Sequence, residues 1–268
     1  MSRQDENAHI FEFKKENAKE LAHMIKTLLF REFGVIYPYD KGLKITVDDG
    51  HCQQANAYLD SSIFTTFFCK ENDLKLKVPL KTIAECLNIC EGTVNSAKMS
   101  YAGFYDPMRI LVEETDGPVI RAKIHVLVPE QELDFEFSDD NVTATCLMKT
   151  QLLKEIFKDF DASSRTVVIT FDPNKLEFST NGDVGEMIVS IPTRSLQMEK
   201  MDYSGPISHR YRLTLIQRMI PVITLGTKVI LRIDDRGVLC AQFTVEHGDN
   251  KNSYIEFLTV PDDENFTD

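Results

Sequence analysis

The chain has 268 residues, 43% of them hydrophobic and 27% charged, and its 30 Lys and Arg against 42 Asp and Glu give a formal net charge of −12. This length suggests two domains, or one large one, with enough apolar residues for a sizeable core, so global disorder is excluded. A net-acidic protein does not bind nucleic acid through its overall charge, so any such contact needs a locally basic face.

Two further classes of protein do not fit the sequence. No stretch approaches the roughly 18 uninterrupted apolar residues of a membrane span, and the polar first residues lack the apolar region of a secretory signal. The six cysteines are scattered without a CxxC pair, which argues against a disulfide framework or a zinc ribbon and favours a reducing compartment.

Strand and helix patterns alternate along the first half of the chain. We expect strands over residues 9–13, 33–39, 43–47, 53–59, 63–69, 74–78, 99–101, 109–113 and 119–128. Helical periodicity covers residues 14–29 and 79–90, and Pro79 stands where a first helical residue is favoured. Apart from the short strand over 99–101, no strand is placed over residues 92–103.

The second half repeats this order. We expect strands over residues 142–148, 167–171, 176–179, 184–191, 210–213, 229–233, 238–245 and 254–260, and helices over 150–160 and 214–220. Residues 198–206 are left without a placed strand. Most connections are too short for parallel crossovers, so the fold class is α+β, two similar domains each with two helices against antiparallel sheets.

The expected boundary between the halves is an acidic connector. Residues 129–140 contain six acids and no base, and Leu133, Phe135 and Phe137 alternate with the acids in a half-buried, extended pattern. We therefore predict an N-terminal domain over 1–128, a connector over 129–140 that lies against a domain, and a C-terminal domain over 141–268.

Basic residues gather on corresponding helices of the two halves. At about 100° per residue, Lys15, Lys19, His23 and Lys26 fall opposite the apolar face of the first helix. Such a face is usually only solvated, but its repetition in both halves makes a phosphate backbone a natural partner. The full candidate DNA-facing set is Lys14, Lys15, Lys19, Lys26, Lys81, Lys149, Lys154, Lys158 and Arg218.

The sequence contains little that indicates a catalytic or metal-binding site. The phosphate-binding, dinucleotide-binding, serine-hydrolase and zinc-protease motifs are all absent from the sequence. Cys86 and Cys90, four apart on a helix, could share a metal, although core packing fits them better. The acid pairs at 48–49, 139–140, 234–235 and 262–263 leave a two-metal nuclease as an alternative, but they are spread over both halves. We expect no catalytic residue, metal or cofactor.

The duplicated order resembles a known family, the eukaryotic sliding DNA clamps of the proliferating cell nuclear antigen type. The chain is most similar to the Rad-one-type subunit of the heterotrimeric checkpoint clamp, the nine-one-one complex. The resemblance spans nearly the whole chain and is carried by the segments FREFGVIYPYDKGLKITVDDGHCQQANAYLDSSIF (30–64), PEQELDFEFSDDNV (129–142), LRIDDRGVLCAQFTVE (231–246) and YIEFLTVPDDE (254–264).

This resemblance implies a non-catalytic ring subunit in the nucleus. Such a subunit joins two paralogous clamp subunits, and the ring encircles double-stranded DNA after an ATP-dependent clamp loader places it at recessed junctions. It then recruits checkpoint and repair proteins, and the family is linked to meiosis and telomere maintenance. The alternatives are a homotrimeric replicative processivity clamp and a 3′–5′ DNA exonuclease that uses acidic metal-binding residues.

Two further surfaces are expected. Strands 118–128 and 184–191 are expected to be sheet edges that pair with other subunits, with the interface residues Ile120, Ala122, Ile124, Val126, Met187, Ile188 and Val189, although interior strands would also fit. A peptide-binding partner groove is expected beside the connector, lined by Tyr39, Val47, Leu133, Phe135 and Phe137, although these residues would equally fill a core.

Overall fold

The computed structural model describes residues 9–71, 73–89, 95–130 and 135–262. These residues form two compact units, each treated by itself below. The first unit contains the chain up to Asp48, residues 56–132 and residues 247–253, and the second contains residues 49–55, 133–246 and the chain from Tyr254 onward.

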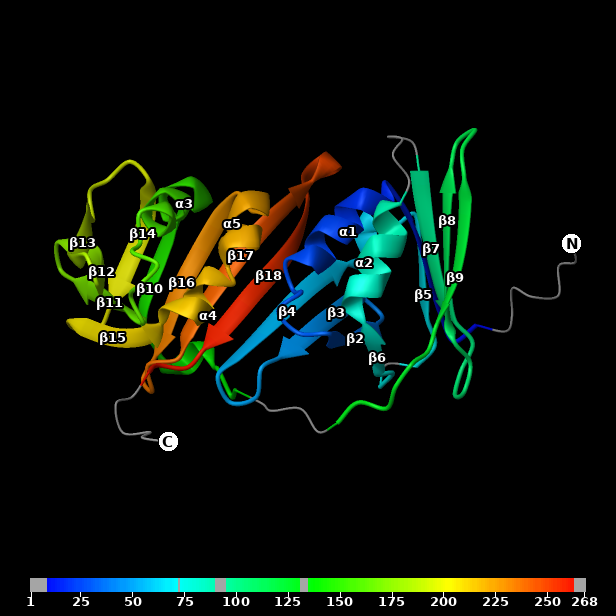
Figure 1. The fold of residues 1–268 in the computed structure, drawn as a ribbon, viewed down its shortest axis with the longest axis horizontal. Helices are drawn as coiled ribbons and strands as arrows, with labels where there is room; N and C mark the ends of the chain where they lie inside the picture. Colours follow the sequence, from blue (N-terminus) through cyan, green and yellow to red (C-terminus); the bar gives the residue numbers. More distant parts are fainter. Residues whose placement is uncertain (1–8, 72, 90–94, 131–134, 263–268) are drawn as a thin grey trace, which may run out of the picture. The chain divides into compact units, whose positions relative to one another are not determined.

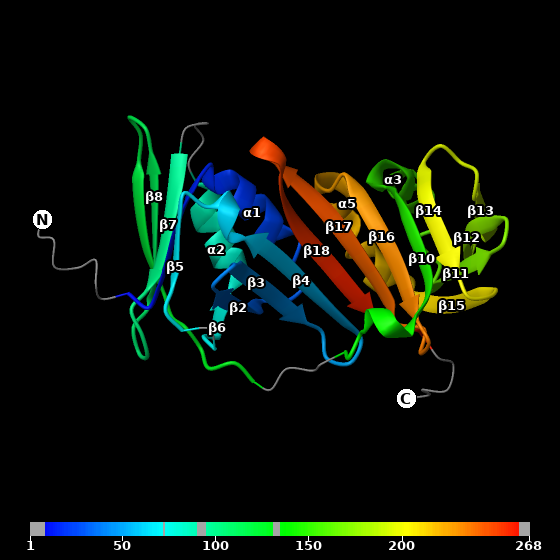
Figure 2. The ribbon, with the colours of Figure 1, turned by 180° about the vertical axis from the view of Figure 1, so that it is seen from behind.

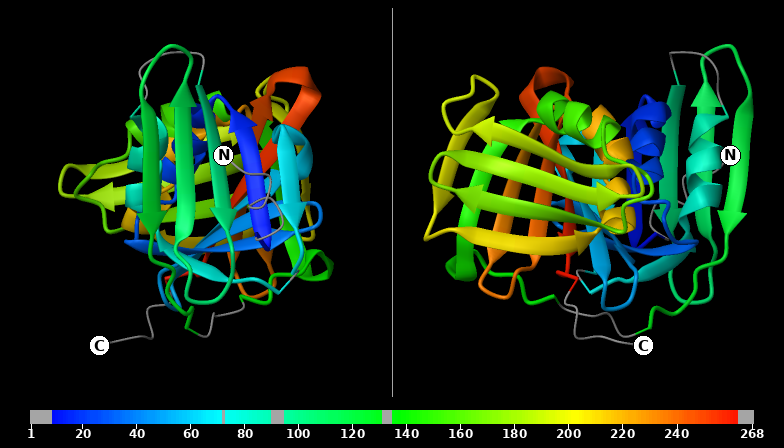
Figure 3. Two further views of the ribbon diagram at one scale, coloured as in Figure 1. Left: turned by 90° about the vertical axis from the view of Figure 1, so that its right-hand side faces the viewer. Right: turned by 60° about the vertical axis from the view of Figure 1, so that its left-hand side comes forward.

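The first unit holds two sheets and two α-helices among its described residues. Its elements are β1 (Phe11–Glu16), α1 (Ala18–Lys26), β2 (Phe33–Tyr39), β3 (Gly42–Asp48), β4 (Gln53–Asp60), the 3₁₀ turn Ser61–Ile63, β5 (Thr66–Cys69), β6 (Leu76–Pro79), α2 (Leu80–Asn88), β7 (Asn95–Tyr101), β8 (Met108–Glu114) and β9 (Val119–Ile124). One sheet has the order β5-β1-β7-β8-β9, and the other runs β4-β3-β2-β6. Figure 3 (left) shows the first of these sheets.

The second unit repeats the arrangement. Its elements are the 3₁₀ turn Asp139–Asn141, β10 (Val142–Lys149), α3 (Thr150–Lys158), β11 (Thr166–Asp172), β12 (Lys175–Gly182), β13 (Gly185–Pro192), β14 (Met198–Tyr203), β15 (Ile207–Arg212), α4 (Leu213–Gln217), α5 (Ile220–Leu225), β16 (Lys228–Asp234), β17 (Leu239–His247) and β18 (Lys251–Thr259). The last residue of β17, the 3₁₀ turn Gly248–Asn250 and the first residues of β18 belong to the first unit. One sheet has the order β13-β12-β11-β15 (Figure 3, right), and β14-β10-β16-β17-β18 follow one another in the other.

The two units therefore share one topology. Taken in chain order, β5-β1-β7-β8-β9 corresponds to β14-β10-β16-β17-β18, and β4-β3-β2-β6 corresponds to β13-β12-β11-β15. The registers within both units are antiparallel. This confirms the predicted α+β class with two similar, largely antiparallel halves.

Each core forms where amphipathic helices cover sheets whose apolar residues alternate. In Figure 1 α1 and α2 lie in front of strands β2 to β4, and Figure 2 shows the same helices from behind those strands. Helix α1 buries Leu21, Met24 and Ile25, while α2 buries Leu80, Ile83 and Leu87. Strand β2 alternates half-buried and buried residues along its whole length, as a sheet with one covered face requires.

Several boundaries differ from those predicted. The first helix begins at Ala18 rather than residue 14, because Lys14 and Lys15 extend β1 and Asn17 takes a left-handed conformation at the junction. The helix predicted over 214–220 ends earlier, as α4 at Gln217, and an unpredicted helix, α5, follows from Ile220 to Leu225. Pro221 stands in the first turn of α5, where a missing N–H is tolerated. Strand β7 extends the strand predicted over 99–101 back to Asn95, and β14 occupies a stretch left without a predicted strand.

Candidate DNA-facing helices and assembly edges

Helix α1 presents a basic face away from its core. Ala18, Leu21, Ala22, Met24 and Ile25 are buried, whereas His23 and Lys26 are exposed and Lys19 is half-exposed. The helix therefore has the polarity that its sequence periodicity predicts. Lys14 lies on β1 instead, where its ammonium is 3.1 Å from Glu16.

Lys15 was wrongly included in the candidate DNA-facing set. Its side chain is only 6% exposed, its ammonium lies 3.0 Å from the Glu20 carboxylate, and it donates to the Ile63 carbonyl at 3.4 Å. The helical wheel misplaced Lys15 because the residue belongs to β1, where alternation turns it inward. Its charge is used inside the first unit and is not presented to a ligand.

The other candidate lysines are exposed on or beside helices. Lys81 on α2 lies 4.0 Å from Glu85, four residues along, and both side chains face solvent. Lys154 and Lys158 are exposed on α3, opposite the buried Leu153, Ile156 and Phe157, and Lys149 is exposed at the residue before this helix.

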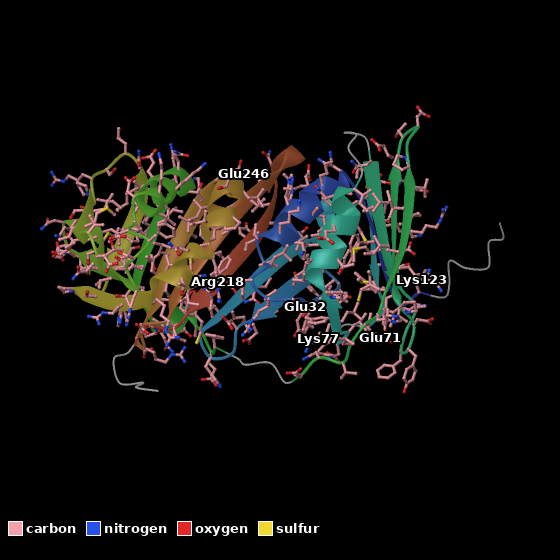
Figure 4. The ribbon with its side chains drawn as sticks, in the orientation of Figure 1. Glu32, Glu71, Lys77, Lys123, Arg218 and Glu246 are labelled. Atoms are coloured by element: carbon pink, nitrogen blue, oxygen red, sulfur yellow. The ribbon has the colours of Figure 1, made fainter. Side chains whose placement is uncertain are left out.

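Arg218 has a structural role that its helical position did not predict. Its guanidinium donates to the Asp49 carboxylate at 2.6 Å and to the Gln53 side chain at 3.3 Å. All three residues belong to the second unit, and Figure 4 labels Arg218 beside α4. Because its guanidinium is ion-paired with Asp49 inside this unit, Arg218 is withdrawn from the DNA-facing set.

Both strands predicted to be edges are edges. Strand β9 ends the sheet β5-β1-β7-β8-β9, and β13 ends the sheet β13-β12-β11-β15, so neither has a second neighbour among the described strands. The sequence suggested that these two strands correspond to each other in the two halves, but they do not. Chain order pairs β9 with β18 and β13 with β4.

The hydrogen-bond phase of β9 decides which residues face the open edge. Glu114 N–H donates to the Pro118 carbonyl at 3.3 Å, so 114 and 118 form a hydrogen-bonded pair. Because such pairs alternate along an antiparallel ladder, the main-chain groups of Ile120, Ala122 and Ile124 point toward β8. The main-chain groups of Val119, Arg121 and Lys123 point outward.

On β13, unlike on β9, one of the predicted interface residues directs its main-chain groups to the open edge. Thr193 N–H donates to the Asn174 carbonyl at 3.0 Å, which makes Met187 and Val189 hydrogen-bonded partners of β12. Ile188 therefore directs its main-chain groups to the open edge, and its side chain is 53% exposed.

Two predicted interface residues require correction. Ile124 is 7% exposed and packs into the first unit, and β9 ends there, so Val126 lies beyond the strand. The predicted strand over 119–128 was too long because Leu127 leaves β9 and bridges to Lys77 instead. The alternating pattern continued past the point at which pairing with β8 stops.

The predicted partner groove is partly filled. Phe135 packs with Val238, Cys240 and Leu258, and Phe137 and Val260 lie against this cluster in the second unit. Val47 is 1% exposed in the core of the first unit, so it cannot line a groove, and Tyr39 is half-buried on β2. Burial and the charge of Asp60 raise the pKa of Tyr39. Leu133 lies outside the described residues.

Two arginines fasten the connector to the second unit. Arg236 donates to the carbonyl of Phe135 at 2.8 Å and also to the buried carboxylate of Asp234 at 2.7 Å. The guanidinium of Arg232 lies 5.5 Å from the centroid of the Phe137 ring and pairs with Asp139. These contacts confirm that the connector residues from Phe135 onward lie against a domain, whereas no sequence pattern indicated the two arginines.

The paired acids do not converge. Asp49 binds Arg218, Asp139 binds Arg232, Asp234 binds Arg236, and Asp262 binds Arg212 at 2.9 Å. Over the described ranges no group of three His, Cys, Asp or Glu residues is placed to hold a metal ion. Cys90, the second cysteine of the candidate pair with Cys86, lies outside those ranges. No described helix is long and apolar enough to cross a membrane.

Comparisons with known proteins agree on one family. A family model described as repair protein Rad1/Rec1/Rad17 matches residues 10–245. The cell cycle checkpoint protein RAD1 homolog mrt-2 of Caenorhabditis elegans is 50% identical over 255 residues, covering 95% of this chain and 96% of the relative. Human cell cycle checkpoint protein RAD1 is 30% identical over 256 residues, covering 93% and 90%. A more distant similarity, 22% over 217 residues, is to the DNA repair exonuclease REC1 of Mycosarcoma maydis, covering 61% and 47%.

Proposed function

The chain belongs to the Rad1/Rec1/Rad17 family of repair proteins, and from this premise we propose that it is a non-catalytic subunit of a DNA-damage checkpoint clamp. It joins two paralogous clamp subunits in a heterotrimeric ring in the nucleus. The ring encircles double-stranded DNA, is placed at primer–template junctions by an ATP-dependent loader, and recruits checkpoint and repair proteins.

One observation carries this proposal: two units of identical topology each leave a sheet edge open. In the second unit the edge of β18 is covered by the chain itself, since Val260 N–H donates to the Cys52 carbonyl at 3.1 Å and Gln53 donates to Thr259 at 2.9 Å. Strand β9 corresponds to β18, and β13 corresponds to β4. An open edge is a template for a strand of another chain, so β9 and β13 are the proposed contacts with the two neighbouring subunits.

The exposed basic residues support a DNA contact that is independent of sequence. Lys19, Lys26, Lys81, Lys149, Lys154 and Lys158 remain proposed DNA-facing residues, on or beside helices α1, α2 and α3. Lysine contacts to phosphate position a protein without reading bases. A chain with a net charge of −12 is better held on DNA by encirclement than by bulk attraction. The remaining groove candidates, Tyr39 and Phe137, stay proposed contacts for partner peptides.

An exonuclease is the second candidate, because one distant relative bears that name. A two-metal nuclease needs carboxylates that converge on one cleft. In this chain the four paired-acid segments each supply a carboxylate to a different arginine, at Arg218, Arg232, Arg236 and Arg212. This distribution favours the non-catalytic clamp subunit.

The proposal is tested by the mass of the chain purified with its two paralogous subunits. We expect one copy of each subunit in the wild-type complex. Ile188→Pro removes an outward donor of β13 and should abolish one contact, whereas Met187→Pro, whose donor points toward β12, should damage the fold instead. A wild-type chain that stays monomeric with both paralogues present, or that forms a homotrimer, would contradict the proposal.

A further inference from the structure

The outer face of β8 and β9 carries three exposed cations. Arg109 on β8 lies directly opposite Lys123 on β9, and Arg121 stands two residues before Lys123 on the same face. Figure 4 labels Lys123 on β9. The side chains of the three residues thus form a basic edge cluster at the border of the sheet.

Within the described part of the chain, no carboxylate forms an ion pair with the three positive charges of this cluster. Arg109 and Lys123 form a pair that is not hydrogen-bonded, in which Cα atoms come to about 4.5 Å and side chains are closest, so like charges oppose each other. The opposed Lys14 and Lys98 on the same sheet are each given a carboxylate, Glu16 at 3.1 Å and Glu12 at 2.7 Å. Over the described ranges, no such carboxylate lies within ion-pair distance of the basic edge cluster.

The outward main-chain groups beside the cluster indicate what kind of partner the edge of β9 can bind. Val119, Arg121 and Lys123 direct both N–H donors and C=O acceptors to the open edge. An extended polypeptide satisfies both kinds of group, because it also alternates donors and acceptors. A phosphate accepts hydrogen bonds only and would leave the outward carbonyls without a partner.

We infer that the edge of β9 binds an extended acidic strand of the neighbouring ring subunit, whose carboxylates neutralise Arg109, Arg121 and Lys123. The identity of the partner as a ring subunit rests on the proposed function. The open edge of β13 differs in charge: its outward residues are Glu186, Ile188, Ser190 and Pro192, with one acid and no base. The chain therefore offers each neighbour a distinct edge, which fixes its place between two different partners.

Charge reversal tests the inference. In Arg121→Glu/Lys123→Glu, binding to one of the two separately purified paralogous subunits should weaken by at least about tenfold, because like charges then face each other. Binding to the other paralogue should be unchanged. The matched control, Lys41→Glu/Lys70→Glu, alters two exposed lysines elsewhere in the first unit and should keep both partners.

A second variant separates the role of charge from a general loss of folding. Arg121→Leu/Lys123→Leu removes the like-charge opposition, so the isolated chain should unfold at an equal or higher temperature than wild type. Its binding to the affected paralogue should still be weaker and should lose most of its dependence on salt. The swap Arg121→Lys/Lys123→Arg should retain binding.

The outcomes distinguish the inference from the proposed function. If the charge-reversed chain binds both paralogues as tightly as wild type, the acidic strand is wrong while the clamp subunit stands. If a duplex oligonucleotide competes with the paralogue for the basic edge cluster, the partner is nucleic acid and the inference is overturned. If the wild-type chain binds neither paralogue, the inference and the proposed function fail together.

Discussion

The turn between β16 and β17 shows how closely single residues are constrained. Asp234 is buried, and its carboxylate accepts from Val238 N–H at 2.8 Å and from the side chain of Arg236. Tyr211, also buried, donates its hydroxyl to the Gly237 carbonyl at 2.8 Å. Gly237 has φ +82°, a conformation that residues with a Cβ rarely adopt. The turn depends on the absence of a side chain at this position.

Gly237→Ala should therefore destabilise the protein more than another left-handed glycine would. Its Cβ would lie 2.6 Å from Nδ1 of His209, which adds an overpacking cost of about 1–3 kcal/mol to the backbone cost. Gly50→Ala is the matched control, since Gly50 has φ +58° with no atom within 4 Å of the added Cβ, and should cost only about 1–2 kcal/mol. Urea unfolding of the two variants measures the difference, and equal losses would contradict this account.

The Glu20 carboxylate lies 3.0 Å from the Lys15 ammonium and 3.5 Å from Nδ1 of His247, and this group makes a pH-dependent contribution to stability. Burial, followed by the charge of Lys15, lowers the pKa of His247, and these effects outweigh the charge of Glu20. Burial raises the pKa of Glu20, but its hydrogen bond and charge interaction with Lys15 lower that pKa overall. Both groups bind protons more readily in the unfolded chain, so the free energy of unfolding falls as pH decreases.

For His247 this loss begins as pH falls through its unfolded value near 6.5 and continues to its lower folded value. Replacing His247 with Gln removes that titration, so the variant should lose less stability than wild type between pH 7.5 and pH 5.5. Urea midpoints at the two pH values provide the measurement. The same pH dependence in both proteins would show that His247 does not contribute.

At the level of elements, chain order was far easier to predict than the ends of helices and strands. Strong alternation in β2 and strong helical periodicity in α3 determine both elements locally. Lys14 and Lys15 also fit a helical wheel, yet pairing with β5 and β7 holds them in β1. Strands β7 and β14 lack a clear local signal and are defined by their partners across the sheet, a contact that no local pattern contains.

The candidate sites show the same limit. Alternation predicted the open edges, but the residues named on β9 direct their main-chain groups inward, because hydrogen-bond phase depends on the turn at 114–118. The arginines that fasten the connector, Arg232 and Arg236, lie about 100 residues from it in sequence. No pattern within the connector indicates them.

The exposed lysines of helices α1 and α3 lead to a prediction about how DNA binding depends on salt concentration. Lys26, Lys154 and Lys158 are exposed on α1 and α3, and each direct phosphate contact contributes about 0.9 to the salt slope of binding to duplex DNA. Replacing all three with Ala should weaken binding of the assembled ring and reduce that slope by about 0.9 for each lysine that had bound a phosphate. Folding and ring assembly should be unaffected, because none of the three lies in a buried position.

The matched control replaces Lys41, Lys70 and Lys75, three exposed lysines outside the helices. It changes the net charge equally, so it separates a local phosphate contact from a general electrostatic effect. When binding to primed DNA is measured across a salt series, this control should have an affinity and a salt slope close to those of the wild type. An equal change in slope for both triple variants would return Lys26, Lys154 and Lys158 to a merely solvated face.

At the scale of the whole molecule, an acidic chain is proposed to work on DNA. Its net charge of −12 disfavours adhesion to DNA at random, while a few lysines on helices support local contact. Two units with the same topology supply two different open edges, which suits a chain placed between two distinct neighbours. The central claim is therefore topological: closure of a ring, more than affinity, keeps the protein on DNA.

The most direct test of this claim is retention on circular DNA before and after the circle is cut. The chain, its two paralogous subunits and the ATP-dependent loader are incubated with a nicked circular plasmid, and the complex is washed with high salt and separated by gel filtration. We expect the ring to remain on the circle and to be lost when a restriction enzyme linearises it. Retention that is the same on circular and linear DNA would show that direct binding holds the protein, and would contradict encirclement.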